Sequence, residues 1–351
     1  LDHTKTAMGK RLIRSWVEQP LINYNAIIQR QNAVEELTAD TILLDSLMNY
    51  LSEMFDIERI MTRIVYGTAN AKELRTLGKT IEQLSNIKSS ISGVKSKMLN
   101  SIYDDIDLLE DILSLIENAI TDDPPLTVRE GGMIKKGYNS ELDTLHDIVE
   151  NGKGFLAEVE QAEQEKTGIK KLKIGYNRVF GYYIEVTNSF KDLVPDYYIR
   201  KQTLSNCERY ITQELKELES KVLGAQERIV RIEYEIFSQI RNTVADQLER
   251  VRVTARAVAR LDSLCSLAYV AVNNNYTRPI VDTSDEIVIK DGRHPVVELM
   301  LNGSPFVPND THLDCRDNRI AIITGPNMAG KSTYMRQVAI ITLMAQIGSF
   351  V

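Results

Sequence analysis

Residues 325–333 read Gly325-Pro326-Asn327-Met328-Ala329-Gly330-Lys331-Ser332-Thr333. The stretch fits the pattern G-x-x-x-x-G-K-[ST], in which backbone N–H groups and a helix N-terminus surround a phosphate. In such a loop Lys331 would contact the β- and γ-phosphates, and the hydroxyl of Ser332 would ligate Mg²⁺. The pattern therefore predicts a nucleotide site in which Mg²⁺ is the metal.

The sequence on either side fits this prediction. Residues 319–324 form a β-branched run that predicts a buried strand, and residues 332–347 predict a helix rich in Ala, Met, Leu and Ile. Hydrolysis also needs an acidic residue on a later strand, and the sequence ends before one. We therefore expect only half of a nucleotide site, which would not hydrolyse nucleotide by itself. We also expect the apolar strand to be poorly ordered or covered by a partner.

Composition places the chain among ordinary globular proteins of two or three domains, with 351 residues, 43% of them hydrophobic and 26% charged. No apolar run long enough for a membrane span occurs. The first residue is Leu1 rather than Met, which suggests an internal fragment. The widely separated Cys207, Cys265 and Cys315 predict reduced thiols in a cytoplasmic protein. The net charge of −7 argues against nucleic-acid binding by the whole surface, but not by a local basic patch.

Helical periodicity dominates the first third of the chain. Apolar residues recur at helical spacing in residues 25–37, 39–51, 56–60, 71–84 and 102–119. The quartet Asp122-Asp123-Pro124-Pro125 ends this pattern, because proline restricts the residue before it and cannot donate in a helix. We therefore predict a helical core domain over residues 1–124.

From residue 139 the apolar period becomes seven. One seam comprises Leu142, Leu145, Val149, Gly152, Leu156 and Val159. A second seam predicts one helix of about 45 residues. It comprises Ile211, Leu215, Leu218, Val222, Ala225, Ile229, Ile232, Ile236, Ile240, Val244 and Leu248. Such heptads favour a pair of long antiparallel arms over two ordinary bundle helices. The first arm is predicted at residues 125–165, and the second arm with its return to the core at residues 211–278. Ser205 or Asn206 is a candidate N-cap of the second arm.

The module between the arms, residues 166–210, changes to period two. It predicts strands at residues 172–176, 182–186 and 197–204, with a hairpin connection at 177–181. Nine Lys or Arg and four Asp or Glu give this module a charge of +5, in a chain of −7. Among them lie Tyr176, Tyr182, Tyr183, Tyr197, Tyr198 and Tyr210. This pattern suits contact with nucleic-acid phosphates, although a solvated surface over a small tyrosine core would also produce it.

The remaining residues, 279–351, contain the phosphate pattern. Residues 286–289 predict a strand, residues 292–295 a turn, and residues 306–309 a loop.

In this order, these motifs resemble the MutS family of DNA mismatch-repair ATPases over essentially the whole chain. Residues 1–12 are similar to the opening of that family's core domain, and residues 292–298 and 324–333 to the start of its ATPase domain. Residues 175–177, 181–184 and 200–204 resemble the DNA clamp of that family. The resemblance implies a mainly α fold. A helical core would carry long antiparallel lever helices with a small antiparallel β clamp at their tip, and a truncated α/β ATPase segment of ABC type would follow.

The resemblance also implies a function. The clamp would grip the backbone of double-stranded DNA without reading sequence, and ATP with Mg²⁺ at residues 325–333 would control its position through the levers. Phe306 would stack on the adenine, and Asn327 would shape the phosphate loop. Implied partners are a second subunit in a homodimer and a MutL-type repair protein. Candidate DNA contacts are Arg200, Lys201, Thr203, Asn206 and Arg209.

The sequence shows no counterpart of the family's mismatch-reading and connector domains, and three other interpretations stay open. One is a clamp-less MutS relative acting in recombination or on ribosomes, against which the basic module argues. Another is an SMC-like coiled-coil ATPase, against which the position of the coil before the phosphate pattern argues. The third is a coiled-coil scaffold that binds protein, which weak salt dependence of any DNA binding would support.

Overall fold

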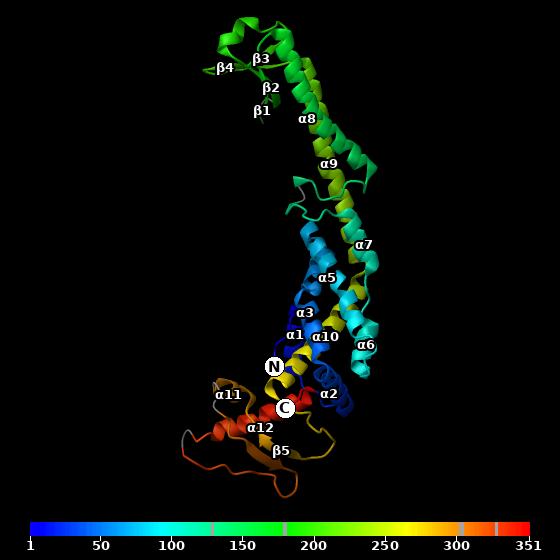
Figure 1. Ribbon diagram of the computed structural model, residues 1–351, viewed down its shortest axis with the longest axis vertical. Helices are drawn as coiled ribbons and strands as arrows, with labels where there is room; N and C mark the ends of the chain where they lie inside the picture. Colours follow the sequence, from blue (N-terminus) through cyan, green and yellow to red (C-terminus); the bar gives the residue numbers. More distant parts are fainter. Residues whose placement is uncertain (128–129, 178–180, 302–304, 327–328) are drawn as a thin grey trace. The chain divides into compact units, whose positions relative to one another are not determined.

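The computed structural model describes residues 1–127, 130–177, 181–301, 305–326 and 329–351. These residues form two compact units. The first comprises residues 1–68, 76–113 and 244–351, and the second comprises residues 69–75 and 114–243. Figure 1 labels most of the elements of both units. The predicted mainly helical fold with a small antiparallel sheet is confirmed.

Helices make up the core of the first unit. They are α1 (Ala7–Glu18), α2 (Tyr24–Ala39), α3 (Thr41–Ser52), α4 (Ile57–Val65), most of α5 (Ala71–Ser90), α6 (Lys97–Asp105) and α10 (Leu248–Asn274). Several begin at a side chain that accepts a hydrogen bond from a backbone N–H of the first turn, namely Thr6, Asn23, Asp40, Asp56 and Ser96. The helices predicted over residues 25–37, 39–51 and 71–84 are confirmed.

Helix α10 lies at the centre of this core. It packs against α1, α2, α3, α4 and α6. Every residue from 261 to 268 is buried, and Ala and Ser are frequent in α10. Small side chains allow the surrounding helices to approach closely, which explains how one helix can be covered on nearly all sides.

The single helix predicted over residues 102–119 is wrong. Helix α6 ends at Asp105, and α7 (Glu110–Ala119) begins after a break at which Leu109 has a φ of 52°. The carboxylate of Asp107 accepts a hydrogen bond from the Leu109 N–H at 3.0 Å and pairs with Arg250 Nε at 2.8 Å. An aspartate that binds the backbone two residues further on favours a turn over a helix.

The second unit carries a four-stranded sheet between two long helices, α8 (Ser140–Thr167) and α9 (Gln213–Ala245). The strands are β1 (Lys173–Asn177), β2 (Gly181–Thr187), β3 (Ile199–Thr203) and β4 (Cys207–Ile211), and the short helix η2 (Asn188–Leu193) follows β2. All pairs are antiparallel, in the order β1-β2-β4-β3. We call β1–β4 the basic sheet. Strand β4 was not predicted, and residues 178–180 of the predicted hairpin connection lie outside the described residues.

Helices α8 and α9 lie side by side, as Figure 1 shows and as the ion pair between Glu141 and Arg228 confirms. The predicted seams are largely buried, at Leu142, Leu145, Val149 and Val159 of α8 and at Leu215, Val222, Ala225, Ile229, Ile236, Ile240 and Val244 of α9. The single helix of about 45 residues is wrong, because α9 ends at Ala245 and α10 begins at Leu248. Gln247 is the N-cap of α10, and its carbonyl accepts the N–H of Val251 at 3.2 Å.

The last part of the first unit contains β5 (Ile287–Gly292), α11 (Pro295–Met300), β6 (Asn309–Leu313) and α12 (Lys331–Gln346). The strand and helix predicted at residues 286–289 and 332–347 are confirmed. The buried strand predicted at residues 319–324 is wrong, since Ile320 and Ile322 are 85% and 87% exposed. A strand needs hydrogen-bonded neighbours, and no described strand lies beside these residues.

Candidate phosphate loop and candidate nucleic-acid interface

The phosphate loop, residues 325–333, leads directly into α12. Gly330 is the N-cap of α12 and has a φ of 83°, a left-handed conformation that favours glycine. A Cβ at Gly330 would meet no other atom within 4 Å, so the requirement for glycine there is conformational rather than steric. The glycine of the motif therefore turns the chain so that the N-terminus of α12 faces the loop, as an anion site requires.

Lys331 already contacts this loop. Its Nζ donates hydrogen bonds to the carbonyl oxygens of Gly325 and Pro326, the second at 2.8 Å. Ser332, the predicted Mg²⁺ ligand, is exposed on the first turn of α12, and Thr333 beside it is half-buried. Asn327 and Met328 lie outside the described residues. The structure thus brings the lysine and the hydroxyl together at one helix N-terminus.

Strands β5 and β6 hold α12 in place. The buried amide of Gln337 donates to the carbonyl of Gly292 at 2.9 Å, and the hydroxyls of Tyr334 and Thr311 are 2.8 Å apart. A Cβ at Gly292 would lie 2.6 Å from Ile289 Cγ2 and 2.7 Å from Gln337 Nε2, so a larger residue would force these neighbours to move. Phe306, the predicted adenine contact, is half-buried in the segment that leads into β6. These contacts put the Phe306 segment and the phosphate loop in one small subdomain.

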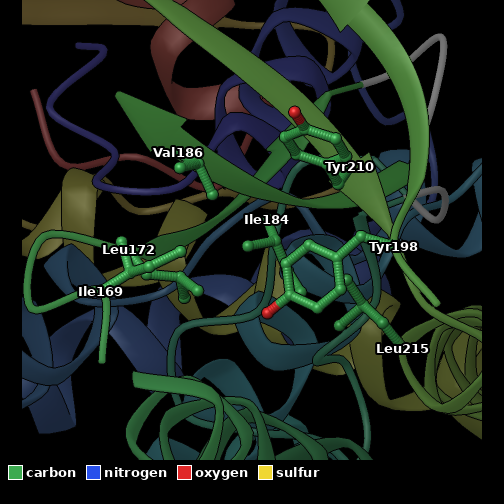
Figure 2. Packing of buried hydrophobic residues seen from close by; sticks show 7 residues of the cluster. All are labelled: Ile169, Leu172, Ile184, Val186, Tyr198, Tyr210 and Leu215. Atoms are coloured by element: carbon green, nitrogen blue, oxygen red, sulfur yellow. The ribbon is translucent and has the colours of Figure 1, made fainter. Parts of the chain in front are cut away.

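An apolar cluster supports the basic sheet from one side. Figure 2 shows its members, which are Ile169, Leu172, Ile184, Val186, Tyr198, Tyr210 and Leu215. Tyr182 packs against this cluster, and Tyr176 packs edge-on to Tyr182. The small tyrosine core considered above is therefore present, and Tyr198 and Tyr210 belong to it rather than to the solvent-facing surface.

A buried carboxylate on α8 fixes two of the tyrosines. Glu163 accepts hydrogen bonds from the hydroxyls of Tyr198 and Tyr197 at 2.7 and 2.9 Å, and Lys166 Nζ lies 3.2 Å away. Burial alone would raise the pKa of Glu163, but the bonds from Tyr198, Tyr197 and Lys166 together lower it. The start of β3 is thereby tied to the end of α8.

The predicted DNA contacts divide into two groups. Arg200, Lys201, Thr203 and Asn206 are exposed on edge strand β3 and on the turn to β4. Arg209 is instead held within the sheet, because its side chain pairs with Glu185 at 3.1 Å, donates to Gln202 at 3.0 Å and lies 4.3 Å from the centre of the Tyr183 ring. Four of the five residues are thus exposed enough to meet a ligand, and Arg209 braces the outer face.

The helix cap proposed at Ser205 or Asn206 is wrong. Both residues belong to the turn between β3 and β4, where Asn188 donates to their carbonyl oxygens at 2.9 and 3.1 Å. The hydroxyl of Thr212 instead accepts the N–H of Leu215 at 3.2 Å at the start of α9. The missed strand β4 accounts for the error, because it separates the turn from the helix.

Sequence reasoning also missed the pairing of Lys191 with Glu208. Lys191 Nζ lies 2.8 Å from a carboxylate oxygen of Glu208, which is 3% exposed. Lys170, Lys171, Lys173 and Lys201 form no ion pair within the described ranges, and all are exposed. The alternation Glu208-Arg209-Tyr210 was the signal that could have revealed β4, since Arg209 faces outward and its neighbours inward.

We predict that the basic sheet loses stability in acid. The ion pair with Lys191 and the hydrogen bond from Tyr210 lower the pKa of Glu208 from 4.5 to about 2, against the rise that burial would cause. The stability from these contacts is therefore fully present above about pH 4.5 and lost as the pH falls towards 2. Near-ultraviolet circular dichroism of the tyrosines should show this loss, and Glu208→Gln should reduce its pH dependence. A signal unchanged between those pH values would contradict the prediction.

The helical core, the basic sheet and the phosphate loop all match domains of the MutS proteins. The family model described as MutS domain III matches residues 1–268, and the model described as MutS domain V matches residues 321–351. The chain belongs to the MutS family.

Similar proteins cover the chain from end to end. It is 53% identical to the DNA mismatch repair protein MutS of Acetivibrio thermocellus, 52% to that of Caldicellulosiruptor bescii and 54% to that of Ruminiclostridium cellulolyticum. Each comparison includes 100% of this chain but only 40% or 41% of the relative. The chain thus spans about two fifths of the length of the curated relatives that it matches.

Two features are absent from the described residues. None of the helices there has the length and apolar character that crossing a membrane requires. None of the His, Cys, Asp and Glu side chains there gather in a group of three or more that could hold a metal ion.

Proposed function

We propose that this chain grips the DNA backbone through the basic sheet and binds ATP at the phosphate loop, as part of a DNA mismatch-repair ATPase. The observation that carries the proposal is the set of exposed cations on the sheet. Arg200 and Lys201 lie on an edge strand, and Lys170, Lys171 and Lys173 lie at the connection from α8 to β1. An exposed basic surface in an acidic chain attracts phosphates without reading bases.

The nucleotide half of the proposal rests on the N-terminus of α12. Lys331 would exchange the carbonyls of Gly325 and Pro326 for the β- and γ-phosphates of ATP, and Phe306 would stack on the adenine. Mg²⁺ keeps several waters and shares phosphate oxygens, so the exposed hydroxyl of Ser332 suits it as one protein ligand. The metal would neutralise charge on the phosphates.

The remaining parts of the proposal concern assembly. We infer a homodimer and a MutL-type partner from the family to which the chain belongs. We infer a cytoplasmic location from the free thiols of Cys207, Cys265 and Cys315. We also infer that the nucleotide state sets the position of the sheet through α8 and α9. The presence of a four-stranded sheet between these helices argues against a clamp-less relative.

The test of DNA binding is a fluorescence-anisotropy titration with matched and single-mismatch duplexes across a salt series. Equal affinities that fall steeply with salt would support backbone binding by the sheet. No binding at low salt would contradict it for this chain, and binding with little salt dependence would favour the protein-binding scaffold.

We predict that replacing both Arg200 and Lys201 with alanine weakens binding to all duplexes about equally. The slope of log K against log salt should become less negative by about 1.8, because each lost phosphate contact removes about 0.9. Lys79→Ala with Lys97→Ala is the matched control, since both lysines are exposed in the helical core. A loss confined to mismatched duplexes would contradict backbone binding.

A further inference from the structure

The inner face of the basic sheet holds a buried carboxylate between two cations. Glu208 lies on β4 and is 3% exposed. Lys191 Nζ and Arg200 Nη1 lie 2.8 and 3.4 Å from the same oxygen, Oε1. The hydroxyl of Tyr210 donates to the other oxygen, Oε2. Both oxygens of Glu208 are therefore engaged, and the two cations are held close to each other.

The cations keep most of their binding capacity. The side chains of Lys191 and Arg200 are 53% and 58% exposed. A lysine ammonium has three donors and an arginine guanidinium has five, so a contact with Glu208 uses only a fraction of them. Two positive charges around one negative charge leave the cluster net positive. An approaching anion would meet exposed donors before it met the buried carboxylate.

We propose that Lys191 and Arg200 bind one DNA phosphate as a pair and that Glu208 is the positioning residue that holds them for it. This inference rests on the proposed function and adds to it Lys191 and Glu208. Long basic side chains lose rotamer freedom when they bind, and a carboxylate that fixes them beforehand reduces this loss. The β3 edge alone would offer Arg200 as a single flexible contact.

Electrostatic repulsion between Glu208 and the phosphate would have the opposite effect on DNA binding. A carboxylate near a phosphate site repels the phosphate, and its removal would add one positive charge to the sheet. If repulsion dominated, Glu208→Gln would tighten DNA binding. If positioning dominates, the same variant weakens binding although the chain has become less acidic. The sign of the change therefore separates the two effects.

The experiment measures the affinity of Glu208→Gln for a matched duplex by fluorescence anisotropy across a salt series. The control is Asp192→Asn, which removes one negative charge from an exposed residue of η2 with no ion pair to any described residue. We expect Glu208→Gln to bind several-fold more weakly with a shallower salt slope, and Asp192→Asn to bind as tightly as the unaltered chain or more tightly. Binding by Glu208→Gln as tight as that of Asp192→Asn would overturn the proposal.

A second set of variants tests whether Glu208 acts through the two cations. With Lys191 and Arg200 both replaced by alanine, adding Glu208→Gln should cause no further loss. If the circular dichroism of the tyrosines shows that Glu208→Gln unfolds the sheet, the Lys191→Ala variant tests the proposal in its place. It should weaken binding to the duplex about as much as Arg200→Ala should, and an unchanged affinity would overturn the pair. Absence of DNA binding by the unaltered chain would contradict the proposed function itself, whereas binding without these effects would contradict only this inference.

Discussion

Replacing Lys331 with alanine should abolish ATP binding at the phosphate loop. In the structure this lysine lies against the loop and donates to the carbonyls of Gly325 and Pro326. Bound phosphates would replace those carbonyls as acceptors. A hydrogen bond to a charged group contributes about 1.5–3 kcal/mol, so losing contacts to two phosphates should lower affinity by at least roughly a hundredfold. Equilibrium binding of a fluorescent ATP analogue with Mg²⁺ measures the loss.

The control for this prediction is Lys290→Ala. Lys290 is exposed on β5 in the same subdomain, so its removal changes the charge equally without touching the loop. Its affinity for the analogue should match that of the unaltered chain. If Lys331→Ala bound ATP as well as Lys290→Ala did, residues 325–333 would not be the phosphate site.

The parts of the fold with long, regular periodicity were the most predictable from sequence. Helices α8 and α9 follow heptads sustained over many turns, so a few atypical residues did not obscure them. Strands β1 and β2 were predicted from apolar residues at every second position, such as Ile174 and Tyr176 in β1 and Ile184 and Val186 in β2. The phosphate loop was predictable for another reason, since its pattern fixes both a conformation at Gly330 and a donor at Lys331.

The errors arose where a distant residue decides local structure. The break before α7 depends on Asp107, whose carboxylate pairs with Arg250, 143 residues further on. Residues 319–324 have strand composition, but a strand also needs neighbours to bond. Strand β6 carries Asn309, Asp310 and His312, and its pairing with β5 outweighs a composition that does not favour strands.

The candidate nucleic-acid interface was only partly predictable. The count of charged residues identified the basic module, but it could not show which cations are paired with other side chains of the sheet. In the sequence Arg209 cannot be told apart from Arg200, yet alternation along β4 points Arg209 to the outer face, where Glu185 and Gln202 hold it. The grouping of Lys191 with Glu208 requires the pairing of β2 with β4, which brings together residues 17 positions apart.

The largest loss of stability in the helical core is expected from Asp262→Ala. Asp262 is buried on α10 and ties down the start of α1. Its carboxylate accepts the N–H groups of Lys5 and Thr6 at 2.9 and 2.8 Å and the hydroxyl of Thr6 at 2.7 Å. Alanine would leave the buried donors without an acceptor, at about 1–3 kcal/mol for each group. We expect the free energy of unfolding to fall by about 3 kcal/mol.

Denaturant unfolding measures this loss, and Asp285→Ala is the control because Asp285 is exposed. Asp262→Asn distinguishes lost hydrogen bonding from lost volume. The asparagine fills the same space but has a single acceptor oxygen, which can still accept from Thr6, so its amide nitrogen would face the N–H of Lys5. We therefore expect Asp262→Asn to be destabilised, by about 1–3 kcal/mol for the Lys5 N–H that loses its acceptor, and less than Asp262→Ala. If the asparagine variant were as stable as the unaltered chain, the volume of the side chain, rather than its two acceptors, would hold α1 to α10.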